Sequence, residues 1–99
     1  MSISWDQLLA TARKELGEKT LCNIHEATSY QWAARALAAY DNALTSGNAV
    51  REAHWLRDGD DYAHEAAEHA ALAVVLGSQT SVLTDVLTKL ARAKKRVTT

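Results

Sequence analysis

Acidic and imidazole side chains gather in one short stretch of this chain. Within two helical turns the sequence places His64, Glu65, Glu68 and His69, preceded by Asp61. Residues three or four positions apart lie on the same face of an α-helix, so most of these side chains would stack together. Carboxylate and imidazole groups in such a stack hold divalent metal ions, transfer protons, or form ion pairs in water.

A metal-binding helical bundle is the first chemical hypothesis for this stretch. Imidazole nitrogen and carboxylate oxygen are donors that Zn, Mn and Fe sites use. The segment 68–72 resembles a helix of the ferritin-like bundles, in which a Glu and a Glu-x-x-His pair project inward from facing helices. Asp61 and His64 have that spacing, with Asp in place of Glu. The hypothesis predicts a divalent metal cofactor held by His64, Glu65, Glu68 and His69, with further ligands from His25, Glu26, Asp41, His54 or a second copy of the chain.

The same four residues also fit two simple ion pairs on a solvated helix. His64 and Glu68 are four residues apart, as are Glu65 and His69, and such pairs stabilise a helix by about 0.2–0.5 kcal/mol each. The zinc-protease pattern His-Glu-x-x-His does not occur here, because position 68 holds Glu. Ordinary ion pairs therefore stand as an alternative to the metal site.

A ribonuclease is a further hypothesis, carried by Arg57 and His64. Their spacing resembles the Arg-to-His motif of HEPN-type RNases. Seven residues make two helical turns, so both side chains would share a face if the helix is continuous. The resemblance implies metal-independent cleavage, in which the Arg stabilises phosphate charge and the His moves the proton of a 2′-hydroxyl.

Two segments resemble parts of a tetratricopeptide repeat, a protein-binding module. The pattern Trp55-x-x-Asp58-Gly59-x-x-Tyr62 is similar to the opening of its first helix, with Asp58 where the motif has Leu. A second pattern, similar to the second helix, consists of Ala36, Tyr40, Ala43 and Leu44. Aromatic residues and arginine carry much of the binding energy at protein interfaces. The partner-contacting residues predicted on this basis are Trp55, Arg57 and Tyr62.

Four helical segments must position these residues. Ser4 and Gln7 form a capping box at the first helix, with Ile3 packing on Leu8, and Gly17 ends it. The remaining segments are expected from Asn23 or Thr28 to Gly47, from Asn48 to Leu76, and from a cap at Ser78 or Thr80 to the basic residues 94–96. The pattern predicts an all-α antiparallel bundle of four main helices in one domain, residues 1–99. The third helix could be kinked or divided in two near Gly59, which lies among poor helix formers.

Composition narrows the function classes. About one residue in five is alanine, the best helix former, and its small side chain lets helices approach closely. The net charge of −1 argues against a nucleic-acid partner. Acidic residues gather in the third helix and basic residues in the fourth, so an antiparallel pairing that brings Asp61 near Lys94 would explain the segregation.

The single cysteine, Cys22, excludes an intrachain disulfide and suits a reducing cytosol. Neither a signal peptide nor a membrane-spanning stretch is expected. No set of residues forms a catalytic constellation within one chain, so we expect no catalytic residues and lean against an enzyme. The function predicted is a small cytoplasmic binding or regulatory protein that acts through protein–protein contacts and self-associates, most simply as a homodimer.

Overall fold

Four α-helices account for most of the residues that the structure describes. The computed structural model describes residues 4–99, apart from the side chains of Trp5, Leu9 and Arg13. The helices are α1 (Trp5–Leu16), α2 (Glu18–Thr45), α3 (Ala49–Val75) and α4 (Thr80–Thr98). Within this part of the chain no β-strand occurs. The prediction of an all-α chain with four helices is confirmed.

Two of the predicted helix starts are confirmed by their capping hydrogen bonds. The Gln7 backbone N–H donates to Ser4 Oγ at 3.2 Å, and the Ser4 N–H donates to Gln7 Oε1 at 3.1 Å, which is a capping box. Asn48 Oδ1 accepts from the backbone N–H groups of Val50 and Arg51 at 2.9 and 3.1 Å. The predicted contact of Ile3 with Leu8 lies outside the described residues.

Two other predicted starts are wrong. The second helix begins at Glu18 rather than at Asn23 or Thr28. Gly17 adopts a left-handed φ of 82°, so the chain turns within one residue and the next helix starts at once. At α4 the N-cap residue is Gln79, without a capping side chain. The hydroxyl of Ser78 donates to Glu26 Oε2 at 2.9 Å instead, so it serves a contact with α2.

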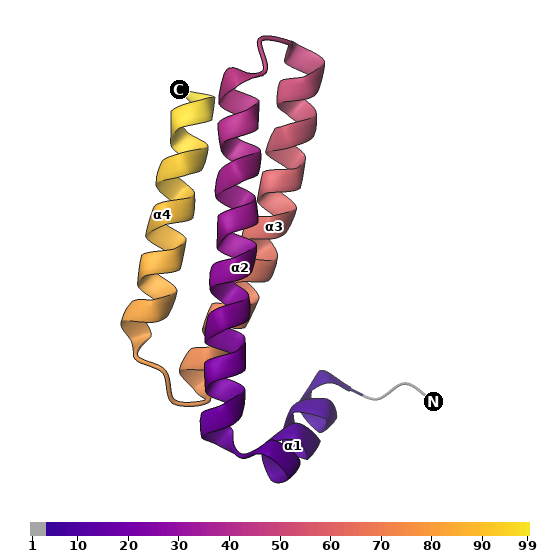
Figure 1. Ribbon diagram of the computed structural model, residues 1–99, viewed down its shortest axis with the longest axis vertical. Coiled ribbons are helices and arrows are strands. Elements are labelled where there is room, and N and C mark those ends of the chain that lie inside the picture. The colour runs from indigo at the N-terminus through magenta and orange to yellow at the C-terminus, as the bar shows by residue number, and fades with distance from the viewer. Residues whose placement is uncertain (1–3) are drawn as a thin grey trace.

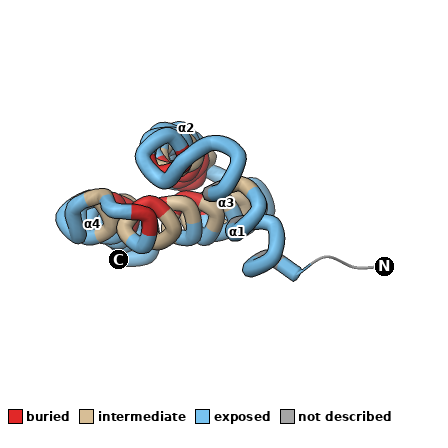
Figure 2. Tube along the Cα trace, turned by 90° about the horizontal axis from the view of Figure 1, so that it is seen from below, coloured by how far each residue is buried: buried red, intermediate tan, exposed pale blue. Residues whose placement is uncertain are grey.

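The three long helices form the packed part of the molecule. Figure 1 shows α3 running opposite to α2 and α4, and Figure 2 shows α2 lying over a row that contains α3 and α4. The short helix α1 leaves this bundle on the side away from α4, and its described contact with the core is Ala12. The Cα radius of gyration is 15.6 Å, against about 13 Å for a compact domain of this length, because the long helices form an elongated body from which α1 projects. A four-membered antiparallel bundle is therefore not confirmed.

A seven-residue repeat of small side chains forms the contact between α2 and α3. On α2 the buried residues at this spacing are Cys22, Ser29, Ala36 and Ala43, and on α3 they are Gly59, Ala66 and Ala73. A repeat of seven keeps the same residues on one seam when two helices wrap around each other. Because each of these side chains is small, the two backbones approach closely.

Hydrogen bonds from α2 side chains to α3 carbonyls fix the register of this contact. Ser29 Oγ donates to the carbonyl of Ala66 at 2.8 Å, and both residues are fully buried. One repeat earlier in α2, Cys22 Sγ lies 3.5 Å from the carbonyl of Ala73, which is one repeat later in α3. The two helices are therefore antiparallel neighbours in a single register, and a buried hydroxyl that would otherwise be unsatisfied has a partner.

Gly59 does not split α3, contrary to the sequence-based expectation. The helix is continuous from Ala49 to Val75, and Gly59 is buried within it. A Cβ atom added at Gly59 would lie 2.6 Å from Cε1 of Tyr40, so the glycine provides the space for that ring. Glycine in a helix interior is destabilising, and the packing of the Tyr40 ring against the helix backbone compensates for this cost at Gly59.

Tyr40 also connects α2 to α3 and, through it, to α4. Its hydroxyl donates to Asp60 Oδ1 at 2.7 Å, and Lys94 Nζ lies 3.2 Å from the same oxygen. Burial raises the pKa of Tyr40 well above its ordinary value, and the hydrogen bond to Asp60 raises it further, so the hydroxyl stays protonated. We expected Lys94 beside Asp61, and the observed partner is the preceding residue, Asp60.

The substitution Gly59→Ala is expected to destabilise the protein. A methyl group at this position overlaps the Tyr40 ring, and overpacking costs about 1–3 kcal/mol, more than the ~1 kcal/mol gained in helix propensity. Urea unfolding followed by circular dichroism measures the change. In the Tyr40→Ala background the same substitution should become neutral or stabilising, and an equal loss of stability in both backgrounds would show that the ring is not the cause.

Candidate functional sites on the face away from α4

One side of the α2–α3 pair is not covered by α4. Asp60 points toward α4, as its ion pair with Lys94 shows. Tyr62 follows two residues later and so leaves α3 in nearly the opposite direction. Tyr62 meets Trp32 of α2 there, with ring centroids 5.7 Å apart. The open side of α2 and α3 is therefore marked by this pair of half-buried aromatic rings.

A hollow lined by aromatic and acidic side chains occupies this open side. Its lining residues are Trp32, Asp61, Tyr62, His64 and Glu65. The guanidinium of Arg35 lies 4.8 Å from the centroid of Trp32, in the range of a cation–π contact. The ring of Trp32 thus already binds one cation on the surface of α2. Because two carboxylates stand beside the rings, the hollow favours a further cationic group.

Two histidines face each other next to this hollow, one from each helix. Nδ1 of His25 on α2 lies 3.0 Å from Nδ1 of His69 on α3, and the rings stack with centroids 5.2 Å apart. Nε2 of His69 lies 4.0 Å from a carboxylate oxygen of Glu65. Burial lowers the pKa of His25 below its ordinary value of 6.5, and the neighbouring His69 lowers it further. His25 is therefore neutral near pH 7, and in the short contact between the two Nδ1 atoms one ring donates a hydrogen bond and the other accepts it.

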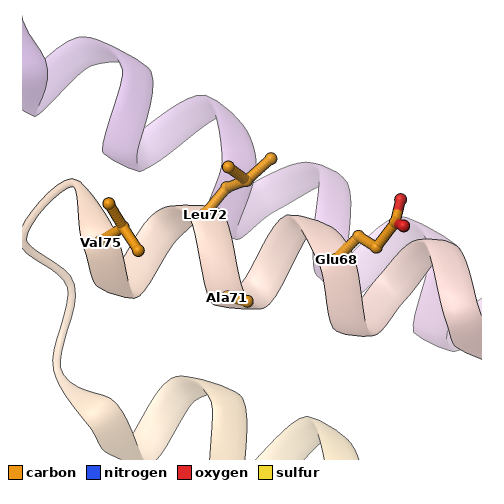
Figure 3. A pocket seen from close by; sticks show the side chains of 4 residues that line it. All are labelled: Glu68, Ala71, Leu72 and Val75. Atoms are coloured by element: carbon orange, nitrogen blue, oxygen red, sulfur yellow. The ribbon is translucent and has the colours of Figure 1, made fainter. Parts of the chain in front are cut away.

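The four residues predicted as metal ligands fall into two separate pairs. Nε2 of His64 lies 3.0 Å from Glu68 Oε1, on an exposed part of α3, while His69 turns toward His25. Figure 3 shows Glu68 at the edge of a hollow lined by Ala71, Leu72 and Val75. Within residues 4–99, as far as the structure describes them, no three His, Cys, Asp or Glu side chains are grouped as metal ligands. Of the further ligands considered from sequence, His25 is the one that meets His69.

The other predicted site residues lie at different places along α3. Arg57 Nη2 lies 3.3 Å from Nδ1 of His54, whereas His64 pairs with Glu68, so the two residues of the ribonuclease hypothesis make separate contacts two turns apart. Trp55 is half-buried, with its ring edge-on to His54 at 6.0 Å. Trp55 and Tyr62 are seven residues apart on a continuous helix, so they share a face that Arg57 does not.

Charged side chains on two helices face opposite flanks of the molecule. On α3, the acidic flank consists of Asp58, Asp61, Glu65 and Glu68, which point away from the α4 side marked by Asp60. On α4, the basic flank consists of Arg92, Lys95 and Arg96, which are exposed opposite the buried Leu90. In the described part of the chain, the one ion pair between α3 and α4 is that of Asp60 with Lys94. The two flanks therefore make no ion pair with each other in the described part of the chain, and three acidic flank residues contact histidines of α3 instead.

No family model, no curated protein and no solved structure matches this chain. Among its described helices, none combines the length and the apolar character needed to cross a membrane.

Two features of the open side escaped the sequence analysis. The stacking of Trp32 on Tyr62 and of His25 on His69 both depend on the register of α2 against α3. The sequence signal that could have predicted this register is the seven-residue repeat of small residues on both helices.

The stability of the metal-free protein is expected to fall on mild acidification because of His25. The folded state holds the His25 proton less tightly than the unfolded chain does, so this contribution is present above pH 6.5 and is lost as the pH falls below that value. Urea unfolding at pH 7.5 and pH 5.5, with a chelator present, measures the difference. His25→Gln should reduce it, whereas His64→Gln, at an exposed position, should not. Equal pH dependence in all three proteins would contradict the assignment to His25.

Proposed function

We propose that this chain is a small binding protein that acts through protein–protein contacts, and that copies of it associate through their charged flanks. The observation that carries the proposal is the presence of an acidic and a basic surface on opposite sides of one molecule. Complementary surfaces of opposite charge steer association and set the orientation of the partners. The free cysteine Cys22 suits a reducing compartment, which favours the cytoplasm as the place where the protein acts.

The hollow beside Trp32 supports this proposal with a specific docking position. A guanidinium placed there would lie beside the two aromatic rings and could donate hydrogen bonds to the carboxylates of Asp61 and Glu65. The basic flank offers Arg92 and Arg96, both exposed on α4. An arginine of one copy therefore fits the acidic, aromatic hollow of the next copy.

The positions of the two flanks favour head-to-tail association. An isologous dimer requires the same surface on both subunits to be self-complementary. Here the acidic flank of α3 faces away from α4, and the basic flank faces away from α3. Contacts between unlike surfaces are heterologous, and they lead to rings or to open chains of subunits. We therefore propose assembly that grows with concentration, in place of the homodimer expected from sequence.

Self-association is expected to depend strongly on salt. Light scattering coupled to size exclusion should show masses above that of one chain at about 50 mM NaCl and a shift toward the monomer at about 500 mM, where screening shortens the range of charge interactions. The variant Arg92→Glu/Arg96→Glu should be monomeric at low salt. Adding an equal amount of an Asp61→Arg/Glu68→Arg variant should restore association, because the exchanged charges are again complementary.

The matched control is Lys14→Glu/Arg51→Glu, which makes the same charge change at exposed positions outside both flanks. This variant should associate as the wild type does. A monomeric wild-type protein at low salt, or equal loss of association in the control, would exclude the proposed contact.

A further inference from the structure

The facing nitrogens of His25 and His69 stand at the spacing of two ligands of one metal ion. Imidazole nitrogen binds zinc at about 2.0–2.1 Å, so two nitrogens on one tetrahedral ion are about 3.3 Å apart, and about 2.9 Å apart at a right angle. The observed Nδ1–Nδ1 distance is 3.0 Å. Each ring directs the same atom, Nδ1, at the other, and both come from rigid helices rather than from loops.

Glu65 lies where an outer-shell carboxylate of a metal site is found. Histidines that bind a metal through one nitrogen usually donate the other N–H to a carboxylate, which fixes the tautomer. A carboxylate oxygen of Glu65 is 4.0 Å from Nε2 of His69, at the end of the ring opposite to Nδ1. If the Glu65 side chain closes this gap to hydrogen-bonding distance, it holds the His69 proton at Nε2, and His69 then presents an unprotonated Nδ1 toward His25. Only the proton on Nδ1 of His25 must then move, through water, to its own Nε2.

The surrounding packing holds the two rings in place. Ser29 donates to the Ala66 carbonyl one turn from the histidine pair, and Cys22 contacts the Ala73 carbonyl one turn on its other side. These contacts fix the α2–α3 register on both sides of the pair. Both rings are partly exposed, so water can fill the remaining coordination positions.

We propose that His25 and His69 form a two-histidine binding site for a divalent transition metal of the zinc, nickel and copper class, with Glu65 as the outer-shell partner of His69. This class suits imidazole ligands, whereas magnesium and calcium prefer an all-oxygen set. The site joins α2 to α3. Its ligands differ from the set expected from sequence, because only His69 of that set is a ligand here. It shares Glu65 with the acidic flank, but both ligands come from one chain, so metal binding does not require copies of the chain to associate.

Metal titration of the purified, tag-free protein tests the proposal. Isothermal titration with NiCl₂ and ZnCl₂ at pH 7.5 should show one ion bound per chain, and saturating metal should raise the melting temperature by roughly 5 °C or more, because the ion binds the folded state. MgCl₂ should have no effect. His25→Asn and His69→Asn should each weaken nickel binding at least tenfold while helicity measured by circular dichroism stays unchanged.

The matched controls are the two exposed histidines of α3. His54 and His64 each pair with a carboxylate four residues later, and they offer the competing His-carboxylate sites. His54→Asn and His64→Asn should bind nickel as the wild type does. Glu65→Gln should weaken binding by about tenfold, and an unchanged affinity would remove Glu65 from the site. No nickel binding by the wild type, or binding that survives both His25→Asn and His69→Asn, would overturn the proposal.

Discussion

The close approach of α2 and α3 is the constraint on which the rest of the structure depends. Small residues repeat every seven positions on both helices, and a serine hydroxyl on one reaches a backbone carbonyl of the other at 2.8 Å. A contact of this kind leaves no room for large side chains along its centre. Trp32 and Tyr62 therefore meet at its margin, whereas the buried ring of Tyr40 fits against the contact where Gly59 leaves space for it.

This arrangement explains why so small a chain carries half-buried rings on its surface. A core built on leucine and phenylalanine would enclose most of its aromatic residues, whereas here the deeply buried positions are mostly alanine, with Tyr40 from α2 and Val86 from α4. The rings of Trp32 and Tyr62 instead line the open side of the α2–α3 pair, beside the histidines and the acidic flank. Packing and candidate function thus have a common origin, because the seam that brings the helices together also presents these residues.

The helices themselves were largely predictable from the sequence, since capping and apolar spacing are local properties. Ser4 with Gln7 and Asn48 identified two helix starts correctly. The predicted break at Gly59 was wrong. The low helix propensity of glycine is a local property, whereas the Tyr40 ring that packs against the helix there comes from another element.

The candidate sites were less predictable, because they depend on which residues of α2 face which residues of α3. The run from His64 to His69 was read as one surface from its spacing alone. In the folded chain its two ends contact different residues: His64 pairs with Glu68 on the same helix, and His69 contacts His25 on α2. A change of one residue in register also separated the predicted partner of Lys94, Asp61, from the observed one, Asp60. Local patterns do not contain this information unless the repeat on both helices is considered together.

The antiparallel register also has a consequence for how the chain folds. The turn at residues 46–48 joins α2 directly to α3, so the contacts of Ala43 near this turn close a short loop, while that of Cys22 with Ala73 closes a long one. The entropy lost on closing a loop rises with its length, so each contact made near the turn lowers the cost of the next one along the seam. We therefore expect the helical hairpin to form progressively from the turn outward, with α4 docking onto a surface that α2 and α3 have already completed.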